Sequence, residues 1–299
     1  MNEVKTWKVW GNFFLYFIIF ILAATIAAIP RIINGFENES GLLVSISEII
    51  RIFITIVLLF WYTKYVAKLP LNMLTLNLKF LNIGLWILVG FILPILTVVI
   101  FYITGNLFVE TIDTELSQSY IFDTVLKALG MSLAAGFLEE ILFRGYLFNL
   151  LKTKYKFWVA AFAPSLLFTL KHIGGAGSLL NVVQLLISGL LVSFMFIMIY
   201  IYTKSIWNAG IVHFLWNLIL LNGLIAFDTK ENSEVLVQFN IGNNQIFNGG
   251  DFGIEASIPA IIVYGFTSLI LWRLYKKKQQ TTKNIGHLAD SAKNEDDSN

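Results

Sequence analysis

Residues 13–29 read FFLYFIIFILAATIAAI, an apolar run in which no side chain carries a charge. Residues 83–103 form a second run of the same kind. A helix needs roughly 20 residues to cross about 30 Å of hydrocarbon, so such runs are typical of transmembrane helices. The composition agrees, because 57% of the 299 residues are hydrophobic and only 13% are charged, against about 25% charged residues in a soluble domain. The sequence therefore predicts a polytopic integral membrane protein.

The predicted fold class is all-α, a polytopic membrane helix bundle of about eight transmembrane helices. Pro94 predicts a kink in the third helix and Pro164 an irregular fifth helix, since proline removes a helical hydrogen bond. The runs that predict the eight helices lie near residues 12–29, 46–66, 83–104, 121–150, 157–173, 180–202, 206–225 and 256–274.

The basic residues occupy alternate loops of this pattern. Lys68 and Lys79 follow the second run, Lys152 and Lys154 the fourth, and Lys276 the last, whereas the other loops are acidic or neutral. Because cytoplasmic loops carry an excess of Lys and Arg, the arrangement is predicted to be N-in and C-in. The composition, rich in Lys, Asn and Ile, indicates a low-GC bacterium. We therefore expect a multi-pass protein of the bacterial cytoplasmic membrane.

The pattern divides the chain into four segments. Residues 1–120 hold the N-terminal transmembrane helices, and residues 121–225 a core with polar side chains at membrane depth. Residues 226–278 hold an extracytoplasmic loop and the last transmembrane helix, and residues 279–299 a cytoplasmic tail predicted to be disordered because it is polar and aperiodic. The absence of cysteine excludes disulfides and thiolate chemistry.

The expected partners are the lipid bilayer and a membrane-associated peptide or protein substrate. The basic residues lie in loops and form no continuous stripe, which argues against nucleic acid. The oligomeric state stays open.

Three short stretches, residues 136–145, 168–172 and 213–217, place ionisable or amide side chains inside the predicted helices. Such groups cost roughly 2.5–3.5 kcal/mol each on insertion and are therefore candidates for function. At the helical rise per residue, Glu139, His172 and Asn217 lie roughly 18, 22 and 20 Å from the cytoplasmic ends of their helices, and His213 roughly 13 Å. Three separate helices thus bring polar groups to one layer, where side-by-side packing would form a polar chamber.

The spacing inside each stretch adds detail. Glu140 and Arg144 stand four residues apart with the glutamate first, the favourable order for an intrahelical ion pair. That pair leaves Glu139 about 100° round the helix and available for chemistry. His213 and Asn217 share one helix face. Each stretch also has a structural interpretation, as an ion pair, an interfacial histidine or polar contacts between helices.

Taken in order, these stretches resemble the CPBP family of intramembrane proteases, which includes the CAAX proteases and bacteriocin-processing (Abi) proteins and is related to Rce1-type prenyl endopeptidases. The resemblance covers residues 124–222 and includes Gly145 and the Ser205-Ile-Trp207 lead-in to the last motif. The matching motifs are Glu139-Glu140-x-x-x-Arg144, Phe168-x-x-x-His172 and His213-x-x-x-Asn217.

The resemblance implies an intramembrane endopeptidase, with residues 121–225 as its catalytic core. It implies that Glu139, assisted by His172, polarises a water molecule, and that His213 and Asn217 donate hydrogen bonds to the oxyanion. Glu140 and Arg144 complete the candidate site. The family is called metalloprotease, and Glu139, His172 and His213 could ligate zinc with an open position for water. No cofactor is certain, so a divalent metal remains an open alternative.

Two other functions stay open at this point. A proton-coupled transporter could use the same acidic and histidine side chains as a relay, although the sequence contains no inverted repeat of broken helices. A non-catalytic scaffold or bacteriocin-immunity protein could keep the fold and bind a peptide without cutting it. The physiological substrate cannot be read from the sequence, and bacterial relatives of prenyl endopeptidases are not expected to meet prenylated proteins.

Overall fold

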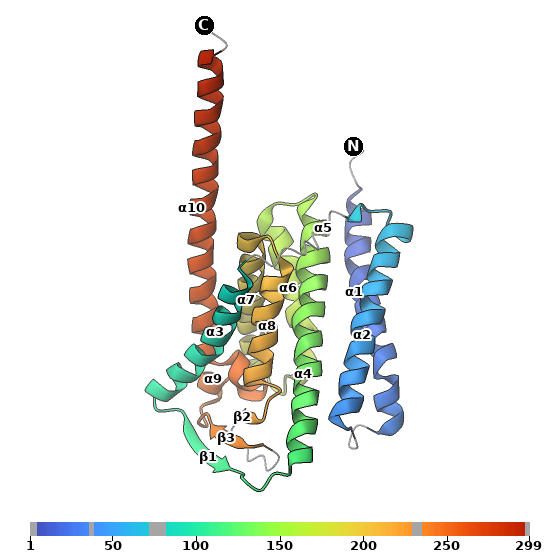
Figure 1. Ribbon diagram of the computed structural model, residues 1–299, viewed down its shortest axis with the longest axis vertical. Coiled ribbons are helices and arrows are strands. Elements are labelled where there is room, and N and C mark those ends of the chain that lie inside the picture. Colours follow the sequence, from blue (N-terminus) through green and yellow to red (C-terminus); the bar gives the residue numbers. More distant parts are fainter. Residues whose placement is uncertain (1–4, 36–38, 72–81, 229–234, 297–299) are drawn as a thin grey trace.

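The computed structural model describes residues 5–35, 39–71, 82–228 and 235–296. Helices dominate, and a small sheet closes one end (Figure 1). In chain order the elements are α1 (Thr6–Asn34), α2 (Gly41–Trp61) with π-helical η2 (Tyr62–Val66), α3 (Ile83–Ile103), β1 (Phe108–Ile112), α4 (Gln118–Glu140), π-helical η4 (Ile141–Phe148), α5 (Asn149–Lys152), α6 (Phe157–Leu170), the 3-10 turn η5 (Ile173–Gly175), α7 (Leu179–Thr203), α8 (Ile206–Leu220), β2 (Ile225–Asp228), β3 (Val237–Asn240), α9 (Gln245–Asn248), the 3-10 segment η6 (Gly250–Ala256) and α10 (Ile258–Asp296).

The predicted membrane bundle is confirmed. Within the described residues, seven helices are long and apolar enough to cross a bilayer. The seventh predicted span, residues 206–225, forms a shorter helix, α8, of 15 residues. Large hydrophobic side chains such as Phe53, Phe91 and Phe266 are exposed on the outside of the bundle. An apolar outer surface suits contact with lipid, so the chain is a multi-pass membrane protein.

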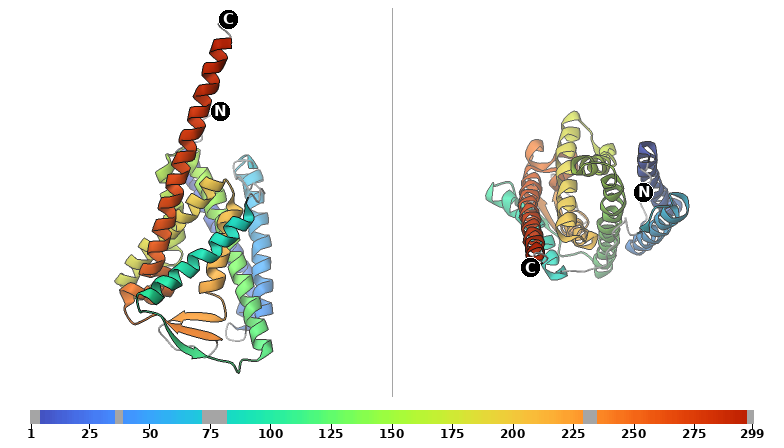
Figure 2. Two further views of the ribbon diagram at one scale, coloured as in Figure 1. Left: turned by 60° about the vertical axis from the view of Figure 1, so that its left-hand side comes forward. Right: turned by 90° about the horizontal axis from the view of Figure 1, so that it is seen from above.

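The helices α1 and α2 form a hairpin on one flank, and α10 lies on the opposite flank (Figures 1 and 2). Between them, α8 packs against α3, α4 and α7. The contact between α4 and α8 is very close: a Cβ atom added at Gly136 would lie 2.7 Å from the backbone nitrogen of Phe214. Only glycine permits this approach, which brings the end of α4 beside the middle of α8.

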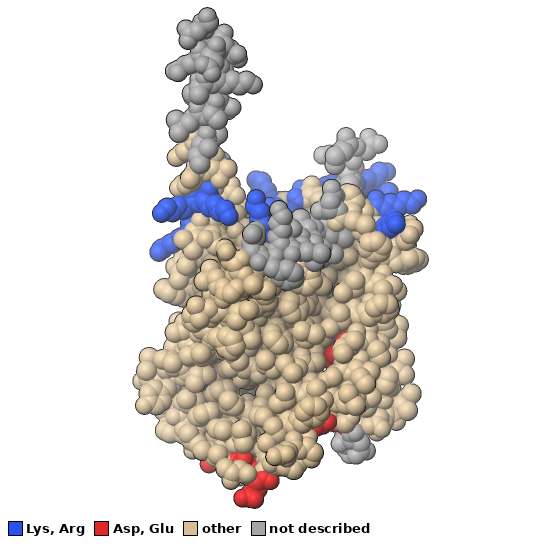
Figure 3. Space-filling view, viewed as in Figure 1, with Lys and Arg blue, Asp and Glu red and all other residues tan. Residues whose placement is uncertain are grey.

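A three-stranded sheet of order β1-β3-β2 joins two loops that are far apart in the sequence. β1 pairs with β3 in antiparallel fashion, and β2 pairs with β3 in parallel. The sheet lies at the end of the bundle opposite to both termini (Figure 1). Lys and Arg gather at the terminal end, and Asp and Glu gather near the sheet (Figure 3). The charges are therefore segregated along the bundle axis, as the loop pattern predicted.

The C-terminal tail differs from its prediction. Instead of becoming disordered after residue 278, the chain continues α10 as a helix to Asp296. Helix formation is cooperative, so a transmembrane helix already formed can be extended by residues that would not nucleate a helix alone. The tail contains no proline to stop that extension.

Candidate active site

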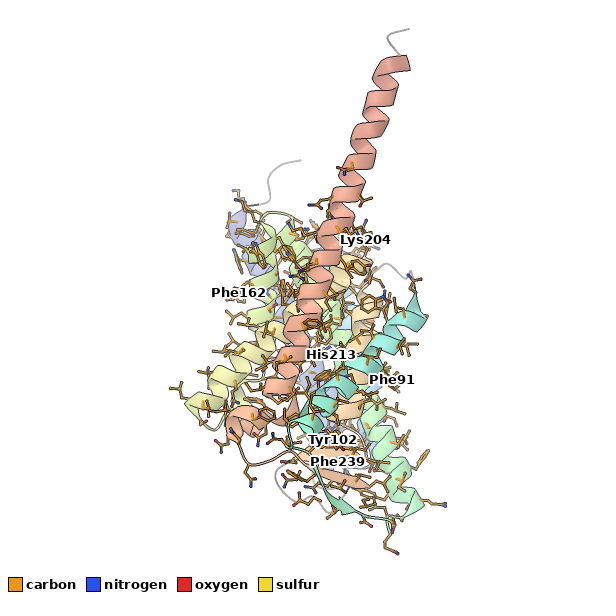
Figure 4. All side chains as sticks on the ribbon, turned by 90° about the vertical axis from the view of Figure 1, so that its left-hand side faces the viewer. Phe91, Tyr102, Phe162, Lys204, His213 and Phe239 are labelled. Atoms are coloured by element: carbon orange, nitrogen blue, oxygen red, sulfur yellow. The ribbon has the colours of Figure 1, made fainter. Side chains whose placement is uncertain are left out.

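The residues singled out from the sequence lie on three neighbouring segments. Glu139 and Glu140 end α4, and Arg144 lies in η4, the π-helical continuation whose eight residues are all buried. His213 and Asn217 lie on α8 and are buried. Figure 4 shows His213 between Lys204 toward the basic end and Phe239 near the sheet. A π-helical turn inside an α-helix is frequent at functional sites, because it redirects the following side chains.

His172 lies near the end of its predicted membrane span. α6 ends at Leu170, so the exposed His172 lies in the turn before η5, within the apolar segment Phe157–Gly175 that is long enough to cross a bilayer. The ring of Phe168 packs edge-on against the imidazole, with ring centroids 5.8 Å apart. Because α6 ends at Leu170, the imidazole of His172 can line the cavity of the site.

Arg144 is completely buried and anchors the site. Its Nη1 atom lies 2.9 Å from Oε1 of Glu140, so the predicted ion pair is present. Its Nη2 atom donates to the backbone oxygen and to the hydroxyl of Ser193, both at 2.9 Å. The guanidinium carbon lies 5.2 Å from the ring centroids of Phe168 and Phe196. These contacts compensate for the loss of hydration of a buried charge.

His213 shares Glu140 with Arg144. Its Nδ1 atom lies 3.1 Å from Oε1 of Glu140, and its ring stacks on Phe196 with centroids 4.6 Å apart. When Nδ1 donates to the carboxylate, Nε2 of a neutral imidazole accepts a hydrogen bond, and it donates only once the ring is protonated. The contact with Glu140 therefore determines the chemistry available at Nε2.

Glu139 has a partner that sequence reasoning missed. The Nζ atom of Lys171 donates to Oε1 of Glu139, and both side chains are largely buried. The rings of Phe143 and Phe168 lie 5.8 and 5.1 Å from the ammonium group. The sequence did contain a signal for this pair, because Glu139 has no counter-charge on its own helix once Glu140 pairs with Arg144. A lysine at the end of an apolar helix needs such a counter-charge.

A cavity of about 220 Å³ joins these groups. Glu139, His172, His213 and Asn217 all line it. A fifth polar group, Glu255, comes from η6. From the sequence, Glu255 is predicted to lie in an extracytoplasmic loop. Its contribution to the site could not be predicted, because η6 reaches the cavity through its packing against α7.

The arrangement does not fit the three-ligand metal site considered above. Among the described residues, no group of three or more His, Cys, Asp or Glu side chains is placed to hold a metal ion. Catalytic zinc requires three convergent protein donors and an open position, and the described residues contain no such group.

Comparison with known proteins identifies this region. Residues 121–219 match the family described as "Type II CAAX prenyl endopeptidase Rce1-like". No curated protein matches the chain. The matched stretch contains Glu139, Glu140, Arg144, His172, His213 and Asn217. Over residues 121–219, the chain is therefore similar to the CPBP family of CAAX-protease-like membrane proteins.

Proposed function

We propose that the protein is an intramembrane endopeptidase that hydrolyses a peptide bond of a membrane-associated peptide or protein. The observation that carries this proposal is the single cavity lined by Glu139, His172, His213 and Asn217. A carboxylate, two imidazoles and a buried amide around one space supply the groups that peptide hydrolysis requires. They are a proton acceptor, donors for an oxyanion and a route for a proton to the leaving amine.

In the proposed reaction, a water molecule lies between Glu139 and His172. Oε2 of Glu139 takes a proton as the water oxygen attacks the scissile carbonyl, while Lys171 holds the other carboxylate oxygen. The proton then passes to the amine as the carbon–nitrogen bond breaks, which leaves a free carboxylate and a free amine. No covalent intermediate with the protein forms.

The oxyanion would be stabilised from α8. The amide of Asn217 donates directly, and Nε2 of His213 donates when the ring is protonated, with Glu140 opposite its Nδ1 atom. Arg144 acts through Glu140 as a positioning residue, because it lies behind the carboxylate and does not line the cavity. The segregated roles explain why two adjacent glutamates, Glu139 and Glu140, are both present.

The test is cleavage of a fluorogenic peptide library by the purified protein in liposomes, with thermal melting recorded on the same samples. Glu139→Gln, His172→Ala and His213→Ala are each expected to abolish cleavage while the protein stays folded. His287→Ala alters the third histidine of the chain and is the matched control. Glu139→Gln cleaving at the wild-type rate would reject this mechanism. Wild-type protein that binds peptides but cleaves none would point to a scaffold instead.

A further inference from the structure

Glu255 differs from the other two glutamates of the site. Glu139 pairs with Lys171, and Glu140 pairs with Arg144. Within the described part of the chain, Glu255 makes no ion pair and its carboxylate accepts no hydrogen bond. A carboxylate that lines a cavity and forms no ion pair has a vacant position for a cation.

The segment that carries Glu255 is held firmly in place. The Tyr264 hydroxyl donates to the backbone oxygen of Glu255 at 3.1 Å. Asp251 accepts hydrogen bonds from the backbone nitrogen of Gly177 at 2.9 Å and from the side chain of Asn181. Gly253 adopts a φ of 59°, a left-handed conformation that favours glycine, and so turns the chain between Asp251 and Glu255. The carboxylate is therefore presented by a fixed scaffold.

A second cavity leads from this segment to the acidic end of the molecule. It measures about 800 Å³, and Asp228 and Asp251 line it. Leu221 and Phe252 line both cavities, so the two adjoin. Carboxylates thus follow one another from the sheet end, where acidic residues gather (Figure 3), to the site. A potential of one sign along a cleft attracts a ligand of the opposite charge.

The inner cavity also offers a neutral polar group. Asn217 is more than nine-tenths buried, lines the cavity and, among the described residues, has no hydrogen bond from its side chain. Because a buried amide without a partner is costly, it indicates a site that is completed by a ligand. Glu255 and Asn217 face the same space, so a peptide could present its carbonyl to one and a neighbouring side chain to the other.

We propose that Glu255 binds the side chain of a Lys or Arg residue next to the scissile bond, which makes the substrate a basic peptide that enters from the acidic end. This inference rests on the proposed endopeptidase activity. Lys171 does not satisfy Glu255, because its ammonium group is bound to Glu139. Close pairs of desolvated charges in protein complexes typically have coupling energies of about 1.5 kcal/mol or more. This corresponds to at least about a tenfold gain in binding affinity.

The experiment compares peptides that are identical except for one residue beside the scissile bond: Lys, norleucine or Glu. Wild-type protein is expected to cleave the Lys peptide at least about tenfold faster in kcat/KM than the norleucine peptide. Glu255→Gln should remove that preference, and Glu255→Lys should reverse it in favour of the Glu peptide. Glu110→Gln, on β1 and outside both cavities, is the matched control and should keep the wild-type preference.

The outcomes separate the two proposals. If the wild-type protein cleaves the peptides and Glu255→Gln keeps the full preference for Lys, the subsite is wrong and the endopeptidase stands. If wild-type protein cleaves none of them or any other library peptide, the proposed function fails and the subsite with it. Should Glu255→Lys fail to fold, the comparison of wild type with the isosteric Glu255→Gln still decides the matter.

Discussion

The Nδ1 atom of His213 lies 3.1 Å from Oε1 of Glu140, the same oxygen that Arg144 approaches to 2.9 Å. One carboxylate oxygen thus connects η4, α4 and α8 in a fully buried network. The imidazole is oriented by an acid that is itself held by a guanidinium. Such a connected network constrains the site geometry only while all its members are present.

The first prediction concerns this network. Glu140→Gln and Arg144→Ala should each lower the free energy of unfolding by about 3–5 kcal/mol, because each leaves a buried charge or its partner unmatched. The double variant should be little worse than either single variant, since both remove the same unit. Thermal melting of the four proteins in detergent measures this cycle. Additive losses would show that the two side chains act independently.

The second prediction concerns Lys171. Lys171→Met leaves Glu139 as a buried carboxylate without a counter-charge, so both stability and cleavage should fall, stability by up to about 3 kcal/mol. Lys171→Arg keeps the charge and should retain most of both. Adding Glu139→Gln to Lys171→Met should restore melting but not cleavage, because the double variant has no unpaired charge and no base. A double variant that melts as low as Lys171→Met would contradict the ion pair.

The third prediction concerns the oxyanion. Asn217→Ala should reduce kcat by about 10²–10³-fold, the usual loss for one oxyanion donor, with little change in melting. Asn149 is a matched control, because its side chain donates to the Tyr200 hydroxyl at 2.9 Å and lines neither cavity. Asn149→Ala should lower the melting temperature and leave kcat near the wild-type value. Equal effects on kcat would assign Asn217 a purely structural role.

The fourth prediction concerns orientation in the membrane. Lys154 and Lys276 should face the cytoplasm, and Glu115 and Asn243 the outside, because Lys and Arg gather at one end of the bundle (Figure 3). The chain has no cysteine, so single cysteines at these positions can be labelled with an impermeant maleimide in intact cells. We expect labelling at positions 115 and 243 only. Labelling at position 154 would reverse the orientation.

The fifth prediction concerns pH and the α1–α2 hairpin. Arg31 donates to both carboxylate oxygens of Glu39, at 2.7 and 2.8 Å, and this hydrogen bonding lowers the pKa of Glu39. A lowered pKa means that the pair stabilises the fold above the unfolded-state pKa of about 4.3 and loses this effect as the pH falls through the folded-state pKa. Glu39→Gln should therefore lower the melting temperature at neutral pH, and the difference from wild type should disappear in acid. A constant difference would exclude the carboxylate as its cause.

Much of this molecule could be predicted from local sequence. Each of the eight predicted runs contains a helix, although the run at 206–225 forms only the 15-residue α8, because a mostly apolar segment in a bilayer can satisfy its backbone polar groups only by helix formation. The ion pair between Glu140 and Arg144 was also predictable, because side chains four residues apart lie on the same face of a helix. The helix predicted for residues 157–173 differs at its end, because α6 stops at Leu170, before His172.

The remaining contacts depend on how helices pack. Lys171 is 32 residues from Glu139, and His213 is 73 residues from Glu140, so no local rule relates them. Their meeting depends on the close approach of α4 and α8 at Gly136 and on the position of α6 beside η4. Glu255 is the clearest example of a residue whose place in the site depends on the packing of distant segments. The sequence by itself determined that these charges lie in or near a membrane, where each must find a partner. Which partner each charge has, and that Glu255 forms no ion pair among the described residues, was decided only by the tertiary structure, because packing alone sets the distances between helices.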